Sequence, residues 1–409
     1  MTLIVKRKKM AFFSVLFTFF VDNLGWSIVF PIFAPLFLDQ KNILLSPNMS
    51  FAGRTTLLGV FLAAFPLAQF FGSPLLGEFA DKAGRKKAFV LSIFLTFIGY
   101  VLTGWSISIN SLVFLFIGRV ITGVFSGNLS VCLACISDFS EDEKARVKNF
   151  GYLSMLGGFS FILGAFIGGK FSDHLVSKYF SFSLPLWIAS ALSLINLLFI
   201  ILAFKETCPL NKNVKYNFFE GFNNIKIALK TKKLKSFYLI YFLFLFGWTI
   251  LFQFTPVLVI KRFSFSNSAV GDLAAFMGIC WALGSLFTNK FLSRRFALLR
   301  ILEISLIIFT VLCGFVGFPH HVIGVLLLLS VCVVIGGIMW PVCAGVLSGF
   351  ASKQMQGKVM GMSQSMQSLA MAISPIVGGL AAESYIHVPF LIAAAASLLA
   401  SLLYFRIKL

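Results

Sequence analysis

Long apolar runs, separated by short polar segments, dominate the chain from one end to the other. A helix needs about 20 mostly apolar residues to cross a bilayer, and twelve stretches of this sequence reach that length. The pattern therefore predicts an all-α membrane protein with twelve transmembrane helices. The predicted spans are 11–38, 55–76, 88–108, 111–134, 148–170 and 184–204 in the first half, and 236–260, 268–289, 297–317, 321–347, 357–382 and 387–406 in the second.

One long polar segment, residues 205–235, divides the spans into two groups of six. It contains eight lysines, and we expect a surface helix within it near residues 218–229. The predicted organisation is an N-terminal six-helix bundle at 1–204, a cytoplasmic linker at 205–235 and a C-terminal six-helix bundle at 236–409.

Short matches between the two halves indicate an internal repeat. Residues 25–30 (GWSIVF) match residues 247–252 (GWTILF), and residues 164–169 (GAFIGG) match residues 374–379 (SPIVGG). Repeated halves of this kind enclose a solute site at their interface, near the bilayer midplane. The repeat therefore favours a transporter that works by alternating access.

Composition and charge agree with a membrane protein. Only 12% of the residues are charged, against about 25% in a soluble domain, while 59% are hydrophobic and the mean hydropathy is +0.95. The net charge of +20 comes from basic residues in alternate loops, at 6–9, 82–87, 212–235 and 294–295. Because cytoplasmic loops are enriched in Lys and Arg, we expect both termini in the cytoplasm of a bacterial inner membrane. Basic residues scattered over separate short loops argue against a nucleic-acid partner.

The most specific motif occupies residues 77–87, between the second and third spans. Gly77 is expected to let two helices approach closely, and Gly84 to allow a tight turn. Asp81 can cap a helix or pair with a basic residue. This segment resembles the signature loop of the major facilitator superfamily, and the rest of the chain is similar to that family in its spans. The resemblance implies a latch that holds the two halves in the outward-open state; its residues are Gly77, Asp81, Gly84, Arg85 and Lys86. The alternative is a basic loop that only sets topology.

Two ionisable residues lie inside predicted spans, where charge is costly unless it is paired. Asp22, in the first span, stands in a segment that resembles the first span of the drug/proton antiporters, including the tetracycline exporters. Arg119, in the fourth span, stands in a segment that resembles the family's second motif, whose arginine takes part in proton relay. A carboxylate away from water can gain and lose a proton near neutral pH. The pair is thus predicted to couple transport to protons. The alternatives are a structural arginine bonded to backbone carbonyls and a cytoplasm-exposed carboxylate at a helix end.

The fifth span carries a run of small residues that resembles the antiporter motif of the same family. Its glycines are Gly158, Gly164, Gly168 and Gly169. The family motif has Gly-Pro where this chain has Gly164-Ala165, and this departure weakens the resemblance. The matching segment of the second half keeps a proline, Pro375.

A substrate cavity with aromatic, thioether and amide walls would suit varied amphipathic ligands. The candidate lining residues are Trp26, Asn128, Trp248, Gln253, Met277, Trp281, Trp340, Gln364 and Gln367. The leading hypothesis is a monomeric, proton-coupled exporter of small amphipathic compounds or drugs, without a cofactor or metal. The sequence contains no P-loop and no metal-ligand spacing, so an enzyme is not expected. A proton-coupled importer of a nutrient on the same fold stays open, as does a membrane sensor or assembly protein that does not transport.

Overall fold

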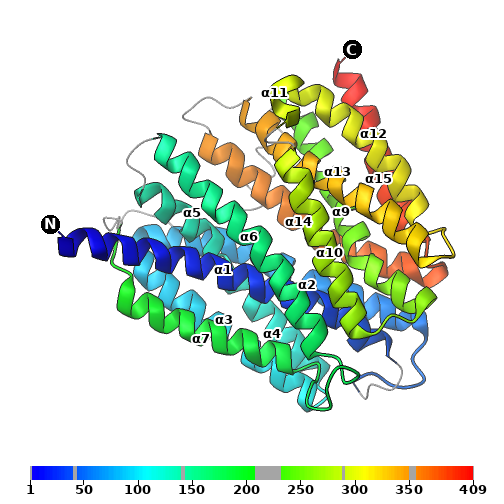
Figure 1. Ribbon diagram of the computed structural model, residues 1–409, viewed down its shortest axis with the longest axis horizontal. Helices are drawn as coiled ribbons and strands as arrows, with labels where there is room; N and C mark the ends of the chain where they lie inside the picture. The colour runs from blue at the N-terminus through cyan, green and yellow to red at the C-terminus, as the bar shows by residue number, and fades with distance from the viewer. Residues whose placement is uncertain are drawn as a thin grey trace. The chain divides into compact units, whose positions relative to one another are not determined.

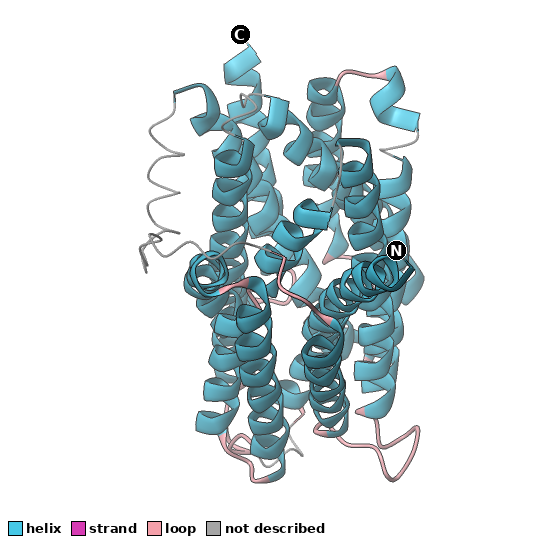
Figure 2. Cartoon of the chain, turned by 90° about the vertical axis from the view of Figure 1, so that its left-hand side faces the viewer, coloured by secondary structure: helices cyan, strands magenta, loops and turns pink. Residues whose placement is uncertain are grey.

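The computed structural model describes residues 2–39, 44–139, 143–207, 232–287, 291–349 and 356–408. Within these ranges the regular secondary structure is entirely helical, as Figure 2 shows. Figure 1 labels most of the helices, whose bounds are as follows. They are α1 (Thr2–Leu38), α2 (Phe51–Ala83), α3 (Arg85–Ser108), α4 (Leu112–Phe125), α5 (Asn128–Phe139), α6 (Glu143–Phe171), α7 (Leu184–Ala203), α9 (Lys232–Phe263), α10 (Asn267–Phe287), α11 (Ser293–Arg295), α12 (Leu298–Val316), α13 (Val322–Gly349), α14 (Gln356–Ser384) and α15 (Val388–Lys408).

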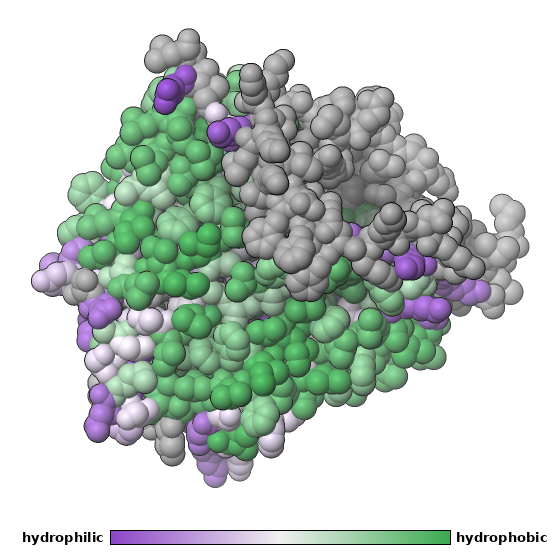
Figure 3. Space-filling model, turned by 180° about the vertical axis from the view of Figure 1, so that it is seen from behind, coloured by the Kyte–Doolittle hydropathy of each residue, from purple (hydrophilic) through white to green (hydrophobic). Residues whose placement is uncertain are grey.

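The helices confirm the membrane fold. Eleven stretches of the described chain are long and apolar enough to cross a bilayer, and α6 adds a shorter apolar helix, Met155–Phe171. Large apolar side chains remain on the outside, among them Leu202 on α7, which is 83% exposed. Figure 3 shows a face on which green apolar residues form much of the described surface. Such a surface is stable only against lipid, so the chain is an integral membrane protein.

The fourth predicted span forms two helices. The predicted span at 111–134 is confirmed as one apolar stretch, Leu112–Ile136, but it contains a break that the prediction missed, since α4 ends at Phe125 and α5 begins at Asn128. The residues between them, Ser126 and Gly127, lie against α2, and a Cβ on Gly127 would lie 2.8 Å from Ser73 Cα. Hydropathy continues across this break, so the apolar pattern alone cannot reveal it.

The described helices group into two compact units. The first comprises Met1–Ile32, Leu67–Glu220 and Asn267–Ala275; the second comprises Phe33–Pro66, Gly221–Ser266 and Phe276–Leu409. Three helices, α1, α2 and α10, therefore contribute to both units. The division into bundles at 1–204 and 236–409 stays a prediction, and the surface helix expected near 218–229 lies outside the described residues.

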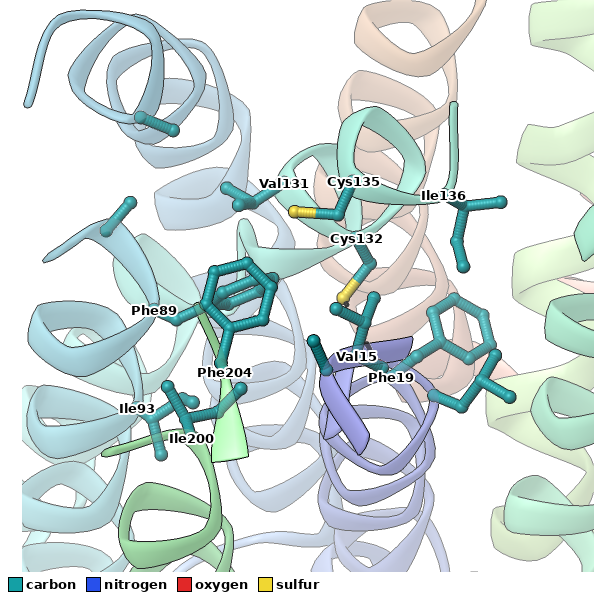
Figure 4. Packing of buried hydrophobic residues seen from close by; sticks show 14 of the residues in the cluster. Val15, Phe19, Phe89, Ile93, Val131, Cys132, Cys135, Ile136, Ile200 and Phe204 are labelled. Atoms are coloured by element: carbon teal, nitrogen blue, oxygen red, sulfur yellow. Dashed lines mark hydrogen bonds between the residues drawn. The ribbon is translucent and has the colours of Figure 1, made fainter. Parts of the chain in front are cut away.

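The core of the first unit is built from apolar side chains on six helices. Val15 and Phe19 of α1 belong to one cluster with Phe89 and Ile93 of α3 and with residues of α2, α5, α6 and α7; Figure 4 shows part of it. Cys132 of α5 is fully buried in this cluster, together with Cys135. Close packing of this kind fixes the register of α1, α3 and α5, and so positions the polar residues that these helices carry.

A polar contact joins the end of α6 to the start of α10 within the first unit. Lys170 Nζ lies 2.7 Å from Asp272 Oδ2 and 2.6 Å from Ser268 Oγ. The Asp173 carboxylate accepts a hydrogen bond from the Ser268 backbone N–H at 2.8 Å, which satisfies a free donor at the start of α10. Sequence reasoning missed this contact, since Lys170 and Asp272 are separated by 102 residues.

Candidate functional site

A buried polar cluster lies in the first unit, around Asp22 of α1. Asn128, the first residue of α5, is fully buried, and its Oδ1 accepts a hydrogen bond from Ser92 Oγ of α3. The Asn128 side chain also lies beside the Asp22 carboxyl group. Neither Asp22 Oδ2 nor Asn128 Nδ2 reaches regular hydrogen-bonding geometry within the described chain. An acceptor and a donor that are buried and unsatisfied are costly, and they are the features expected where a proton or a ligand comes and goes.

Arg119 and Tyr100 extend the cluster. Arg119 on α4 and Tyr100 on α3 are both buried, and Tyr100 is coupled electrostatically to Arg119 and to Asp22. The Tyr100 ring packs against Gly25, one helical turn beyond Asp22, where a Cβ would lie 2.7 Å from Tyr100 Cζ. The structure thus brings the predicted pair, Asp22 and Arg119, to one shared tyrosine.

The glycines of the antiporter-like motif dock α1 onto α6. A Cβ on Gly164 would clash with Ser27 Oγ and lie 2.6 Å from Leu24 O, and one on Gly168 would lie 2.8 Å from Pro31 Cγ. The contact is reinforced by Ser27, which donates to Ser160 O of α6 at 3.2 Å. These glycines therefore set the position of the turn of α1 that follows Asp22.

The other two motif glycines behave differently. Gly169 meets the backbone of α10, where a Cβ would lie 2.8 Å from Gly271 N, so it serves the contact between α6 and α10. Gly158 faces open space, with nothing within 4 Å of a Cβ placed there. A larger residue would fit at Gly158, so helix packing in this structure does not require a glycine at this position of the motif.

The loop motif places a charged pair at the start of α3. Arg85 Nη1 lies 2.7 Å from Asp81 Oδ1, four residues earlier on α2. Gly84 separates the two helices with φ at 99°, a conformation that favours glycine, as predicted for a tight turn. The expectation for Gly77 is wrong, because a Cβ there would lie 3.9 Å from its nearest neighbour, Ser130 Oγ. The close approach between α2 and the following helices occurs instead at Gly72, against Val124.

Glu206 completes this cluster, and sequence reasoning missed it. Its two carboxylate oxygens accept hydrogen bonds from the backbone N–H groups of Arg85 and Lys86, at 2.9 and 3.0 Å. A carboxylate at a helix N-terminus satisfies free donors and opposes the helix dipole. Glu206 lies at the start of the predicted linker, so it ties that segment to the predicted latch. Only the long-range fold brings these residues together, since 121 positions separate Glu206 from Arg85.

The aromatic and amide candidates of the second unit form two groups. Trp248 of α9 and Trp281 of α10 have ring centroids 4.4 Å apart, and Trp248 also stacks on Phe252. In the second group, Tyr241 Oη donates to Gln367 Oε1 at 3.3 Å and also interacts with Trp340.

The remaining cavity candidates are scattered. Gln253 is buried and its Oε1 makes no hydrogen bond within the described chain, while Met277 is almost completely buried. Gln364 is half-buried on α14. In the first unit, Trp26 packs against Phe161, with ring centroids 5.8 Å apart. Asn128, also predicted to line the cavity, lies in the Asp22 cluster. A role in substrate binding stays a prediction for each of these residues.

An apolar helical membrane protein with buried ionisable groups is the architecture of a secondary transporter. The sequence profile of the Major Facilitator Superfamily matches residues 15–336 and 237–408. The chain therefore belongs to the Major Facilitator Superfamily, and it is a transporter of that family.

Several characterised transporters and resistance proteins are similar to this chain over most of its length. The class H tetracycline resistance protein of Pasteurella multocida is 26% identical over 363 residues, covering 87% of this chain and 85% of the relative. Multidrug resistance protein 1 of Bacillus subtilis (strain 168) is 25% identical over 394 residues, covering 94% and 93%. Among solved structures, a D-xylose-proton symporter superposes with a TM-score of 0.76 at 16% identity, covering 97% of each chain. The last likeness concerns the fold alone.

Proposed function

We propose that this protein is a proton-coupled exporter of small amphipathic compounds, with Asp22 as the group that gains and loses the coupling proton. The supporting observation is the cluster around Asp22, where Asp22 Oδ2 and Asn128 Nδ2 are buried without regular hydrogen bonds. Retained ionisable groups inside a membrane usually serve ion or substrate pathways. The names of the relatives, which include tetracycline and multidrug resistance proteins, favour export.

A proton-coupled importer is the second candidate. The fold is shared with a D-xylose-proton symporter, so the architecture fits both directions of transport. Import of a sugar-like solute would require hydrogen-bonding side chains around the substrate. The predicted cavity residues of the second unit include three glutamines that can hydrogen-bond a sugar and three tryptophans that suit an apolar surface, so this lining fits both candidates.

A transport assay in everted membrane vesicles distinguishes the two candidates. The vesicle interior is acidified, and a panel of amphipathic cations, tetracyclines, sugars and nucleosides is offered outside. An exporter that exchanges substrate for protons accumulates an amphipathic compound only while the gradient persists. Accumulation of a sugar or nucleoside only in right-side-out vesicles, under an inward proton gradient, would identify the protein as an importer and rule out the proposed export.

Substitution of Arg119 is expected to alter the pH dependence of transport as well as its rate. Arg119 and Asp22 each act electrostatically on Tyr100, so Arg119→Ala removes a buried positive charge from the cluster that contains the carboxyl group. Arg119→Lys, which keeps the charge, should lie closer to wild type in its pH profile. The measurement is initial transport rate against pH at matched protein levels. If Arg119→Ala lowers the maximal transport rate but leaves the midpoint of the pH–rate profile at its wild-type value, Arg119 has only a structural role.

The predicted topology places the termini and the central linker on the cytoplasmic side, following the positive-inside rule. Single cysteines introduced at Lys215, in the linker, and at Asn48, between α1 and α2, are expected to react with an impermeant thiol reagent from opposite sides. Intact cells should label the Asn48→Cys variant, and everted vesicles the Lys215→Cys variant. Labelling of both from one side would rule out this arrangement.

A further inference from the structure

An apolar groove with a basic end lies on the surface of the first unit, between α3 and α7. It is an open hollow of about 450 Å³ lined by Lys86, Lys87, Val90, Leu91, Phe94 and Leu197. The lining is almost entirely apolar, so the two lysines contribute their aliphatic stems to it, and their ammonium groups belong to its edge. The volume lies within the range of about 300–1,000 Å³ that is usual for small-molecule sites. The helices α3 and α7 run side by side in Figure 1.

The order of residues along α3 gives the groove a direction. Its lining residues recur three or four positions apart, so they share one face of the helix. The two lysines occupy the first turn, and the last apolar residue, Phe94, lies a rise of about 12 Å beyond Lys86. A change from charge to hydrocarbon over this distance matches the step from headgroups to acyl chains in a bilayer. Leu91 and Phe94 are 39% and 45% exposed, so the apolar wall is open to lipid.

The charge at the basic end is positive after the local pairs are counted. The Asp81 carboxylate pairs with Arg85. The Glu206 carboxylate is held by the backbone N–H groups at the start of α3 and keeps its negative charge, so the two lysines leave a net charge of about +1 at this end. Lys86 Nζ donates to Ile201 O of α7 at 2.8 Å, which holds the amine at the rim and leaves two of its three donors. Lys87 is exposed at the same rim. The two ammonium groups therefore remain for an anion.

We propose that this groove is a binding site for an anionic phospholipid. The phosphate group lies between the ammonium groups of Lys86 and Lys87, and one acyl chain follows Val90, Phe94 and Leu197 along the helices. Charge complementarity selects the headgroup, since each basic residue near a membrane surface favours anionic lipid. The apolar wall selects a lipid over a free anion, which would gain nothing from it.

Native mass spectrometry of the delipidated, full-length protein in detergent tests the site. The probes are phosphatidylglycerol, phosphatidylcholine with the same acyl chains, and inorganic phosphate. Wild-type protein is expected to bind phosphatidylglycerol in preference to the other two. Lys87→Gln should weaken that binding about fivefold and the Lys86→Gln/Lys87→Gln double variant about thirtyfold, at roughly one charge contribution per lysine.

Two further variants keep the test decisive. Leu91→Trp fills the groove from an exposed position while both lysines remain, and should lower phosphatidylglycerol binding even if the lysine variants fold poorly. Arg294→Gln/Arg295→Gln removes the same charge from α11, which belongs to the second unit and does not line the groove, and should leave binding unchanged. Equal loss in the arginine and lysine variants would reduce the effect to non-specific attraction and overturn the proposal. Unchanged binding in Leu91→Trp, a preference for phosphatidylcholine, or phosphate binding as tight as that of the lipid would also overturn it.

Discussion

Asp22→Asn is expected to abolish uphill transport driven by a pH gradient while leaving downhill exchange of substrate intact. Asparagine is close to aspartic acid in size, so it preserves the packing of α1 against α3 and α6 but cannot release a proton. The Asn128 and Tyr100 side chains that lie beside the carboxyl group would then face a permanently neutral amide. Without proton exchange the substrate only equilibrates across the membrane, because protons that do not bind the transporter cannot couple their gradient to transport.

The measurement compares accumulation under an imposed pH gradient with counterflow of labelled substrate in the same vesicles. Glu303→Gln on α12 is the matched control, since it makes the same chemical change in another helix. It should retain gradient-driven accumulation. Concentration of substrate by Asp22→Asn would move the coupling site elsewhere, with Glu303 and Glu383 as the next candidates.

Asp81→Asn is expected to reduce transport roughly fivefold or more at normal levels of inserted protein. The Asp81 side chain is 51% exposed, and an ion pair in such a position contributes about 0–1 kcal/mol to stability. Loss of the charge therefore leaves folding nearly unchanged. A bias of about 1 kcal/mol between two conformations nevertheless shifts their populations about fivefold, which is enough to disturb a cycle that depends on both.

Glu206→Gln provides the contrast. It removes the charge that binds two N–H groups at the start of α3, and loss of such a cap costs about 1 kcal/mol. We therefore expect a lower thermal midpoint in Glu206→Gln but not in Asp81→Asn, with Glu78→Gln as a control on α2. Wild-type transport by Asp81→Asn at equal expression would count against the latch.

The sequence predicts the membrane fold and most helices because hydropathy is a local property. It also reveals Asp22 and Arg119, since ionisable residues are scarce in apolar spans. Ser92 and Tyr100 carry no such signal, because hydroxyl side chains are tolerated throughout membrane helices and only the register of α3 brings these two to Asp22. Asn128 is recognisable as a polar residue in a span, but its neighbours depend on the break between α4 and α5.

Contacts between distant segments are the least predictable part. The cap that Glu206 places on α3 and the ion pair between Lys170 and Asp272 each join positions more than a hundred residues apart. In contrast, the conformation of Gly84 follows from the local turn. The packing role expected of Gly77 fails because a motif gives only the residue type, whereas a close approach needs a partner helix at the same position. The backbone of Val124 provides such a partner at Gly72, and none in the described chain lies as close to Gly77.

The most direct test of proton coupling at Asp22 is proton movement itself. Purified protein is reconstituted into liposomes with an acidic interior and an internal pH-sensitive dye, and a compound identified in the vesicle panel is added outside. Wild-type protein is predicted to release protons when the compound enters, Glu303→Gln to do the same, and Asp22→Asn to release none. Equal, substrate-dependent proton release by wild type and Asp22→Asn would contradict the account.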